Sequence, residues 1–187
     1  MIALSLNEAE TLCAKAARGA GYCWGQADDI GRAARALAAE GSDFGAALLV
    51  LLQTRESFIA PTPERLARWR AGGPDIAGVG ALCPVLAATW LTDAGLDAVG
   101  LTLLNIGAPV WLDALLRPAG LGAACDDPFA AGDATLIRRS GPFETGKRAA
   151  VEAEIWRALN AYAAQTYVPE SESSRRRGAG GGRVDDD

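Results

Sequence analysis

The chain has 187 residues, a formal net charge of −5 and no histidine, and half of its residues are hydrophobic. This length suits a single domain of roughly 100–200 residues with a substantial core. The absence of histidine excludes Ser-His-Asp and Cys-His catalysis by one chain alone, together with histidine-bearing metal sites. The acidic balance also argues against a nucleic-acid-binding protein, which would neutralise phosphates with clustered lysine and arginine.

The first forty residues predict a hairpin of two helices. Ser5 is expected to cap the first helix, because Glu8 follows it three residues later and completes a capping box. The second helix is predicted over residues 26–40, with Asp28 and Asp29 in its first turn, where the helix dipole favours carboxylates. Alanines dominate the apolar face of both segments, and small side chains allow two helices to approach closely.

The rest of the chain predicts more helices and two short strands. Asp43 is expected to cap a third helix, although residues 46–52 alone fit a buried strand as well as a helix. Further helices are predicted at 62–70, 82–93 and 111–116, strands at 98–106 and 134–139, and a loop at 120–133. The last helix is predicted to begin at a Thr145 cap and to run to Gln165.

The segment over residues 76–112 is expected to form the centre of the fold, because only Asp93 and Asp97 carry charge in it. It contains uncharged stretches of 17 and 15 residues. A helix that spans a membrane needs about 17–25 apolar residues. Glycine and proline interrupt both stretches, which favours buried core elements over membrane-spanning helices.

The cysteines and carboxylates predict neither a metal site nor a cofactor. Cys13, Cys23, Cys83 and Cys125 match no CxxC or zinc spacing and are interpreted as reduced thiols. Cys23 precedes a helix, where a thiol pKa can fall, but no histidine is present to serve as its base. The aspartates of residues 126–133 are interpreted as turn residues, because the EF-hand pattern is absent. The N-terminus lacks a secretory signal, which predicts a cytoplasmic, reducing location.

Two arginine clusters are candidates for holding an anion, since arginine binds carboxylate and phosphate through paired N–H donors. The first, at residues 65–70, surrounds a tryptophan, and a solvated helix face is the favoured interpretation. The second, at residues 175–177, is followed by a glycine run that includes Gly178 and Gly180. Backbone N–H groups of such a run can converge on an anion, whereas the polar composition of residues 169–187 is otherwise typical of disorder.

Both ends of the chain carry short distinctive motifs. They lie at residues 5–8, 18–21, 24–25 and 166–169, and then at Ser171, Ser174, Arg175, residues 178–180 and the final aspartates. Together these motifs resemble an uncharacterised bacterial family of unknown function, DUF3726. The resemblance implies that the C-terminal segment is part of the domain, although Arg176, Arg177 and Gly182 depart from the family pattern. It implies no known activity.

The sequence as a whole predicts an α+β, mostly helical protein. We expect an N-terminal helical hairpin, an apolar central layer with a few short strands, and a long C-terminal helix followed by an extended arm. The globular domain is predicted over residues 1–168 and the arm over residues 169–187.

The predicted function is binding of, or catalysis on, a small carboxylate-like metabolite. The expected ligand-binding residues are Arg18, Trp24, Arg175, Gly178 and Gly180. The alternative is a non-catalytic accessory subunit that docks on a metabolic enzyme. A homo-oligomer, in particular a dimer, is expected because the arm can reach a second subunit.

Overall fold

The described part of the protein is mostly helical and contains two small antiparallel sheets. A computed structural model describes residues 1–58, 81–93, 99–100, 102–139 and 146–167. In chain order the elements are β1 (Ile2–Ser5), α1 (Leu6–Gly19), α2 (Trp24–Ala39), α3 (Phe44–Gln53), η1 (Arg55–Ser57), α5 (Pro84–Asp93), β2 (Thr102–Ile106), α6 (Pro109–Leu116), η2 (Arg117–Ala119), β3 (Leu121–Ala124), β4 (Gly132–Arg138), β5 (Arg148–Val151) and α7 (Ala153–Ala164). This content confirms the predicted α+β, mostly helical class.

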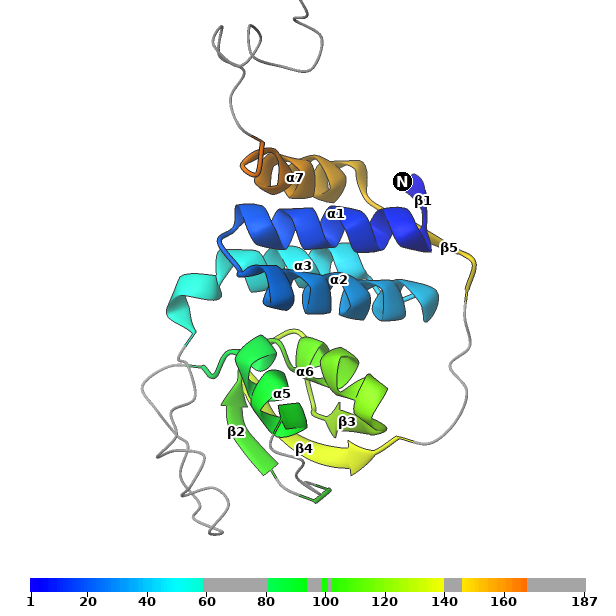
Figure 1. The fold of residues 1–187 in the computed structure, drawn as a ribbon. Helices are drawn as coiled ribbons and strands as arrows, with labels where there is room; N and C mark the ends of the chain where they lie inside the picture. The colour runs from blue at the N-terminus through cyan, green and yellow to red at the C-terminus, as the bar shows by residue number, and fades with distance from the viewer. Residues whose placement is uncertain (59–80, 94–98, 101, 140–145, 168–187) are drawn as a thin grey trace, which may run out of the picture.

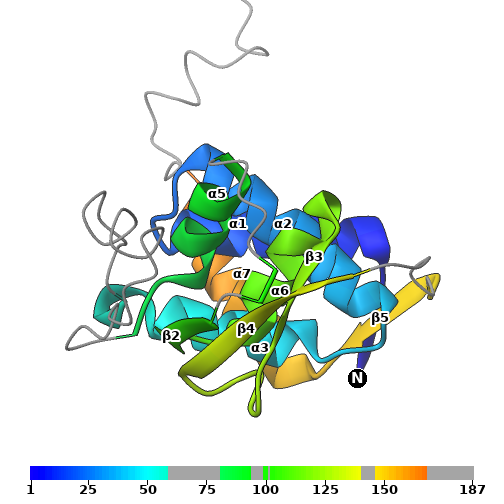
Figure 2. The same ribbon diagram turned by 90° about the horizontal axis from the view of Figure 1, so that it is seen from below.

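The helices and the larger sheet are stacked in layers (Figure 1). α7 lies on α1, and α1 lies on α2 and α3. α5 and α6 lie between this helical stack and the three-stranded sheet. Figure 2 shows that sheet from below, with the two-stranded sheet to one side of it. The protein therefore has a helical part, formed by α1, α2, α3 and α7, and a smaller part that combines α5 and α6 with strands.

The N-terminal hairpin, formed by α1 and α2, is packed as closely as its alanine content predicts. The Ser5 hydroxyl accepts a hydrogen bond from the Glu8 N–H at 3.2 Å, and the Glu8 carboxylate accepts one from the Ser5 N–H at 2.6 Å. Most buried residues of the two helices are alanines. A Cβ on Gly31 would lie 2.9 Å from the Glu10 carbonyl oxygen, so a larger residue would force the helices apart. The hairpin and the capping box are confirmed.

The two-stranded sheet is an element that the sequence analysis does not predict. β1 pairs antiparallel with β5, and Ser5 lies opposite Arg148. β5 alternates exposed and buried side chains over only four residues. Such a short alternation in the sequence cannot be distinguished from the first turn of the helix that follows. The prediction of a helix that starts at a Thr145 cap is wrong, because Arg148–Val151 is a strand and α7 begins at Ala153. Hydrogen bonding to the N-terminal strand outweighs the local helix preference here.

The three-stranded sheet has the order β2–β4–β3, with β4 antiparallel to both neighbours. β2 and β4 confirm the strands predicted at 98–106 and 134–139, with altered bounds. β3 corrects the predicted loop at 120–133. Its sequence, Leu-Gly-Ala-Ala, lacks the β-branched and aromatic residues typical of strands, so pairing with β4 determines its conformation. The buried face of this sheet packs on α5 and α6 through Leu91, Leu103, Leu112, Leu116, Ala134 and Leu136.

Trp111 connects the two parts of the fold. Its side chain is completely buried on α6, and its indole N–H donates to the Ala47 carbonyl oxygen of α3 at 3.1 Å. Both residues belong to the hydrophobic cluster that runs through the helical part. The helical part and the smaller part therefore share one continuous buried cluster.

Several sequence predictions concern residues that the structure does not describe. The helix predicted at 62–70 and the arm predicted at 169–187 lie outside the described residues. Among the described residues, no helix combines the length and the apolar character that crossing a bilayer requires.

Gly19→Ala is expected to destabilise the fold, because a Cβ at this position would lie 1.7 Å from the Tyr162 carbonyl oxygen of α7. Overpacking a close contact costs about 1–3 kcal/mol, so the free energy of unfolding in urea should fall by that amount. Gly25→Ala is the matched control, since nothing lies within 4 Å of a Cβ there. Equal effects of the two substitutions would contradict the close packing of α7 on α1.

Candidate functional site

A groove lies where the end of α1, the beginning of α2 and the end of α7 meet. Its volume of about 750 Å³ falls within the roughly 300–1,000 Å³ of typical small-molecule sites. We call it the hairpin groove. It is lined by Glu10, Thr11, Ala14, Lys15, Arg18, Trp24, Asp28, Arg32, Gln165, Thr166 and Tyr167. Three helix ends converge there because the hairpin turn returns α2 along α1, while α7 packs on the other side of α1.

Arg18 and Trp24, two of the predicted ligand-binding residues, form a stacked pair in this groove. The guanidinium carbon of Arg18 lies 3.7 Å from the centre of the Trp24 ring. Arg18 also donates from Nη1 to the Tyr22 carbonyl oxygen in the hairpin turn, at 3.3 Å. Trp24 nevertheless remains 70% exposed. These contacts orient the guanidinium plane and leave most of the indole surface open to a ligand.

Lys15 and Tyr167 form a second cation–aromatic pair in the hairpin groove. The Lys15 Nζ atom lies 5.9 Å from the centre of the Tyr167 ring, close to the limit of about 6 Å for such contacts. Tyr167 is 63% exposed. It is also the last residue that the structure describes before residues 168–187. The chain therefore continues toward the predicted arm from a residue that lines the groove.

The cations of these two pairs make no ion pair within the described part of the chain. The ion pairs found near the groove use other groups: Arg32 pairs with Asp29, and Arg35 with Glu10. Lys15 and Arg18 thus keep their positive charges available. Two cations that line the same hollow attract an anion to it.

The start of α2 brings Trp24 into the site. The predicted start at residue 26 is wrong, because Cys23 is the N-cap and its N–H donates to the Gln26 side-chain oxygen at 3.3 Å. Asp28 and Asp29 consequently lie in the second turn, where the helix dipole no longer favours them. Trp24 and Asp28 are four residues apart on α2, so both side chains face the groove.

Sequence reasoning missed Lys15, Asp28 and Tyr167 as groove residues. A helix that starts at Trp24 would have placed Asp28 beside it, whereas Tyr167 follows α7 without any pattern that marks it. The other predicted site residues, Arg175, Gly178 and Gly180, lie outside the described residues. The arginine cluster at 65–70 lies outside them too.

The cysteines behave as small core and surface residues. Burial raises the pKa of the Cys13 and Cys83 thiols, so both stay protonated near neutral pH. Cys23 is exposed at the N-cap of α2. None of the four cysteines lines the hairpin groove. A ligand in the groove would therefore contact charged and aromatic side chains rather than a thiol.

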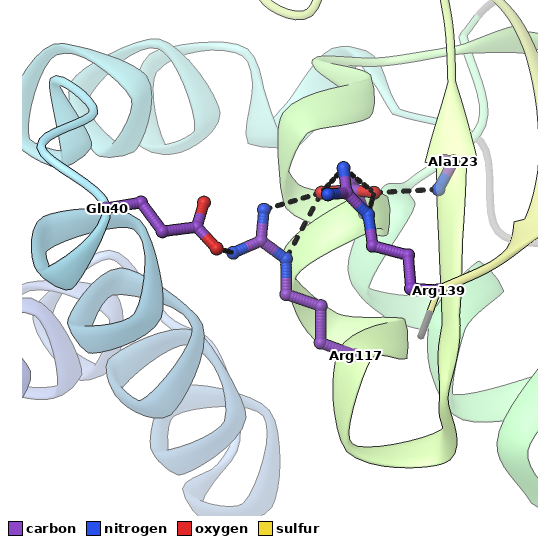
Figure 3. Close-up of polar contacts among 5 residues, drawn as sticks. Glu40, Arg117, Ala123 and Arg139 are labelled. Atoms are coloured by element: carbon purple, nitrogen blue, oxygen red, sulfur yellow. Dashed lines mark hydrogen bonds and ion pairs between the residues drawn. The ribbon is translucent and has the colours of Figure 1, made fainter. Parts of the chain in front are cut away.

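A buried ion network lies between α6 and the end of α2 (Figure 3). The Asp113 carboxylate accepts hydrogen bonds from Arg117 at 2.6 and 3.2 Å, from Arg139 at 3.0–3.1 Å and from the Ala123 N–H at 2.9 Å. Arg117 also pairs with Glu40, the residue that follows α2. Because each buried charge has an opposite charge beside it, we interpret the network as structural. In the sequence, this network is indicated only by the four-residue spacing of Asp113, in the apolar α6, and Arg117, directly after it.

A second hollow, of about 480 Å³, lies between α2, α5 and α6. Alanine side chains form much of its wall. Its arginines, Arg32 and Arg117, are paired with carboxylates. The hairpin groove is therefore the better candidate for binding an anion.

Asp113→Ala is expected to destabilise the protein by about 3–5 kcal/mol, because it leaves buried cationic charge without its shared acceptor. Arg139→Ala should cost less, since the Arg139 side chain is 42% exposed. Unfolding in urea measures both values. If Asp113→Ala costs no more than Arg139→Ala, the network does not stabilise the junction of the two parts.

Comparisons with known proteins reach only the N-terminal region. No curated protein and no solved structure matches the chain. A family model described as "Protein of unknown function (DUF3726)" matches residues 4–58, a segment that contains α1, α2 and α3 and both Arg18 and Trp24. The resemblance of the C-terminal arm stays a prediction. Residues 4–58 of this chain are thus similar to DUF3726, a protein family of unknown function.

Proposed function

We propose that the hairpin groove binds a small molecule that carries a carboxylate. The proposal depends on the Arg18–Trp24 pair, in which a guanidinium lies 3.7 Å from the centre of an exposed indole ring. Within the described residues this guanidinium has no ionic partner. Arginine binds a carboxylate through two parallel N–H···O bonds that are stronger than neutral hydrogen bonds. A carboxylate is therefore a ligand group that matches this cation.

Charged groups of both signs surround Arg18 in the groove. Lys15 precedes Arg18 by three residues on α1, and both side chains line the groove. Glu10 and Asp28 line it too and lower its positive potential. With Arg32 counted, three cationic and two anionic side chains line the groove, so its net charge is positive and attracts an anionic ligand group.

The predicted arm is proposed to complete the site. Arg175, Gly178 and Gly180 follow Tyr167 by at most 13 residues. An extended chain spans about 3.3–3.6 Å per residue, so this segment is long enough to fold back over Arg18 and Trp24. A second arginine and a run of glycine N–H groups would then add donors to the same carboxylate.

Arg18→Gln is expected to weaken binding of a carboxylate probe, such as 3-phenylpropionate, by about tenfold, because a hydrogen bond to a charged group contributes about 1.5–3 kcal/mol. Isothermal titration calorimetry of the full chain measures the affinity. Arg157→Gln, an exposed position on α7 outside the groove, is the control and should bind like the wild type. If no carboxylate binds the wild type, or if both variants weaken binding equally, the proposal is wrong.

Deletion of residues 169–187 is expected to weaken binding of the same probe without lowering the melting temperature of the unliganded protein. The expected loss is at least about tenfold, the amount that one charge-assisted contact supplies. Thermal shift with and without the probe measures both quantities. Unchanged affinity in a folded deletion variant would restrict the site to the hairpin groove and contradict the role proposed for the arm.

A further inference from the structure

Asp28 is an acidic group of the hairpin groove that has no ionic partner among the described residues. It lies one turn after Trp24 on α2 and is exposed. No ion pair or hydrogen bond engages its carboxylate within the described residues. The neighbouring acidic groups are already used: Asp29 pairs with Arg32, and Glu10 accepts a hydrogen bond from Arg35 at 3.2 Å.

The groove therefore combines available charges of both signs around one aromatic ring. Arg18 stacks on Trp24, and Asp28 stands beside Trp24 on the same face of α2. Lys15 adds a second cation, and Tyr167 adds a second exposed ring. A ligand that satisfies all these groups needs a carboxylate, a cationic nitrogen and a flat apolar body.

We infer that the ligand of the hairpin groove is an aromatic α-amino acid, an inference that rests on the proposed carboxylate site. Its carboxylate binds Arg18 and Lys15, and its ammonium group binds Asp28. Its ring packs against Trp24, whose indole is 70% exposed. In such a zwitterion the carboxylate and the ammonium group are attached to the same carbon atom, which matches Arg18 and Asp28, two opposite charges that line the groove with Trp24.

The two charged ends of the ligand give the site its selectivity. A carboxylate without an ammonium group leaves Asp28 unpaired and places a second negative charge near it. An amine without a carboxylate leaves Arg18 unpaired in the same way. Because each mismatch loses one charge-assisted hydrogen bond, each should lower affinity by about tenfold.

Three matched ligand pairs test the inference by calorimetry on the full chain. Phenylalanine, tyrosine and tryptophan are each compared with the deaminated analogue: 3-phenylpropionate, 3-(4-hydroxyphenyl)propionate and indole-3-propionate. At least one amino acid should bind the wild type about tenfold more tightly than its analogue. Asp28→Asn should abolish this difference and leave binding of the analogue unchanged or stronger. Asp126→Asn removes the same charge from the exposed β3–β4 connection and should preserve the difference.

The outcomes separate this inference from the proposed function. If the analogues bind in an Arg18-dependent manner but no amino acid binds more tightly, the zwitterion is wrong and the carboxylate site stands. The same conclusion follows if Asp28→Asn leaves the difference intact. If neither class of ligand binds, the proposed function and the inference are both wrong. If Asp28→Asn fails to fold, the affinities of the wild type for each amino acid and its deaminated analogue alone decide whether the ligand is a zwitterion.

Discussion

The close packing of α1 against two neighbouring helices determines where the hairpin groove lies. Gly31 of α2 allows a close approach to the Glu10 carbonyl of α1, and Gly19 of α1 allows a close approach to the Tyr162 carbonyl of α7. Both contacts are made to backbone atoms, which cannot turn aside as a side chain can. Because α1 packs against both α2 and α7, two cations of α1 contact aromatic rings that are distant in the sequence: Arg18 contacts Trp24, and Lys15 contacts Tyr167.

The protein places its charges in two distinct ways. Asp113 and Arg117 are buried, and each is matched by an opposite charge, because an unpaired ion in the core is strongly destabilising. In the hairpin groove Arg18 and Asp28 stay in contact with water, and neither has an ionic partner within the described residues. Solvation makes this arrangement tolerable in the free protein. A ligand with complementary charges replaces that water.

Local interactions explain which features the sequence analysis predicts correctly. The Ser5 capping box and the alanine face of the hairpin depend on residues three or four apart, and both are confirmed. β3 and β5 are missed because their conformation depends on strands far away in the chain. Arg18 and Trp24 flank a glycine-containing turn that is visible in the sequence, and their role in ligand binding stays a prediction, whereas Tyr167 joins the groove only through the packing of α7. The dimer and the role of the arm stay predictions, because the structure describes one chain up to residue 167.

A crystal structure of the full chain with a bound aromatic carboxylate tests the account of the hairpin groove. We predict that the ligand carboxylate lies within hydrogen-bond distance of the Arg18 guanidinium while Arg18 remains stacked on Trp24. The account would be contradicted if Arg18 turned away from Trp24 to pair with a carboxylate of the protein, or if the ligand occupied a different part of the surface.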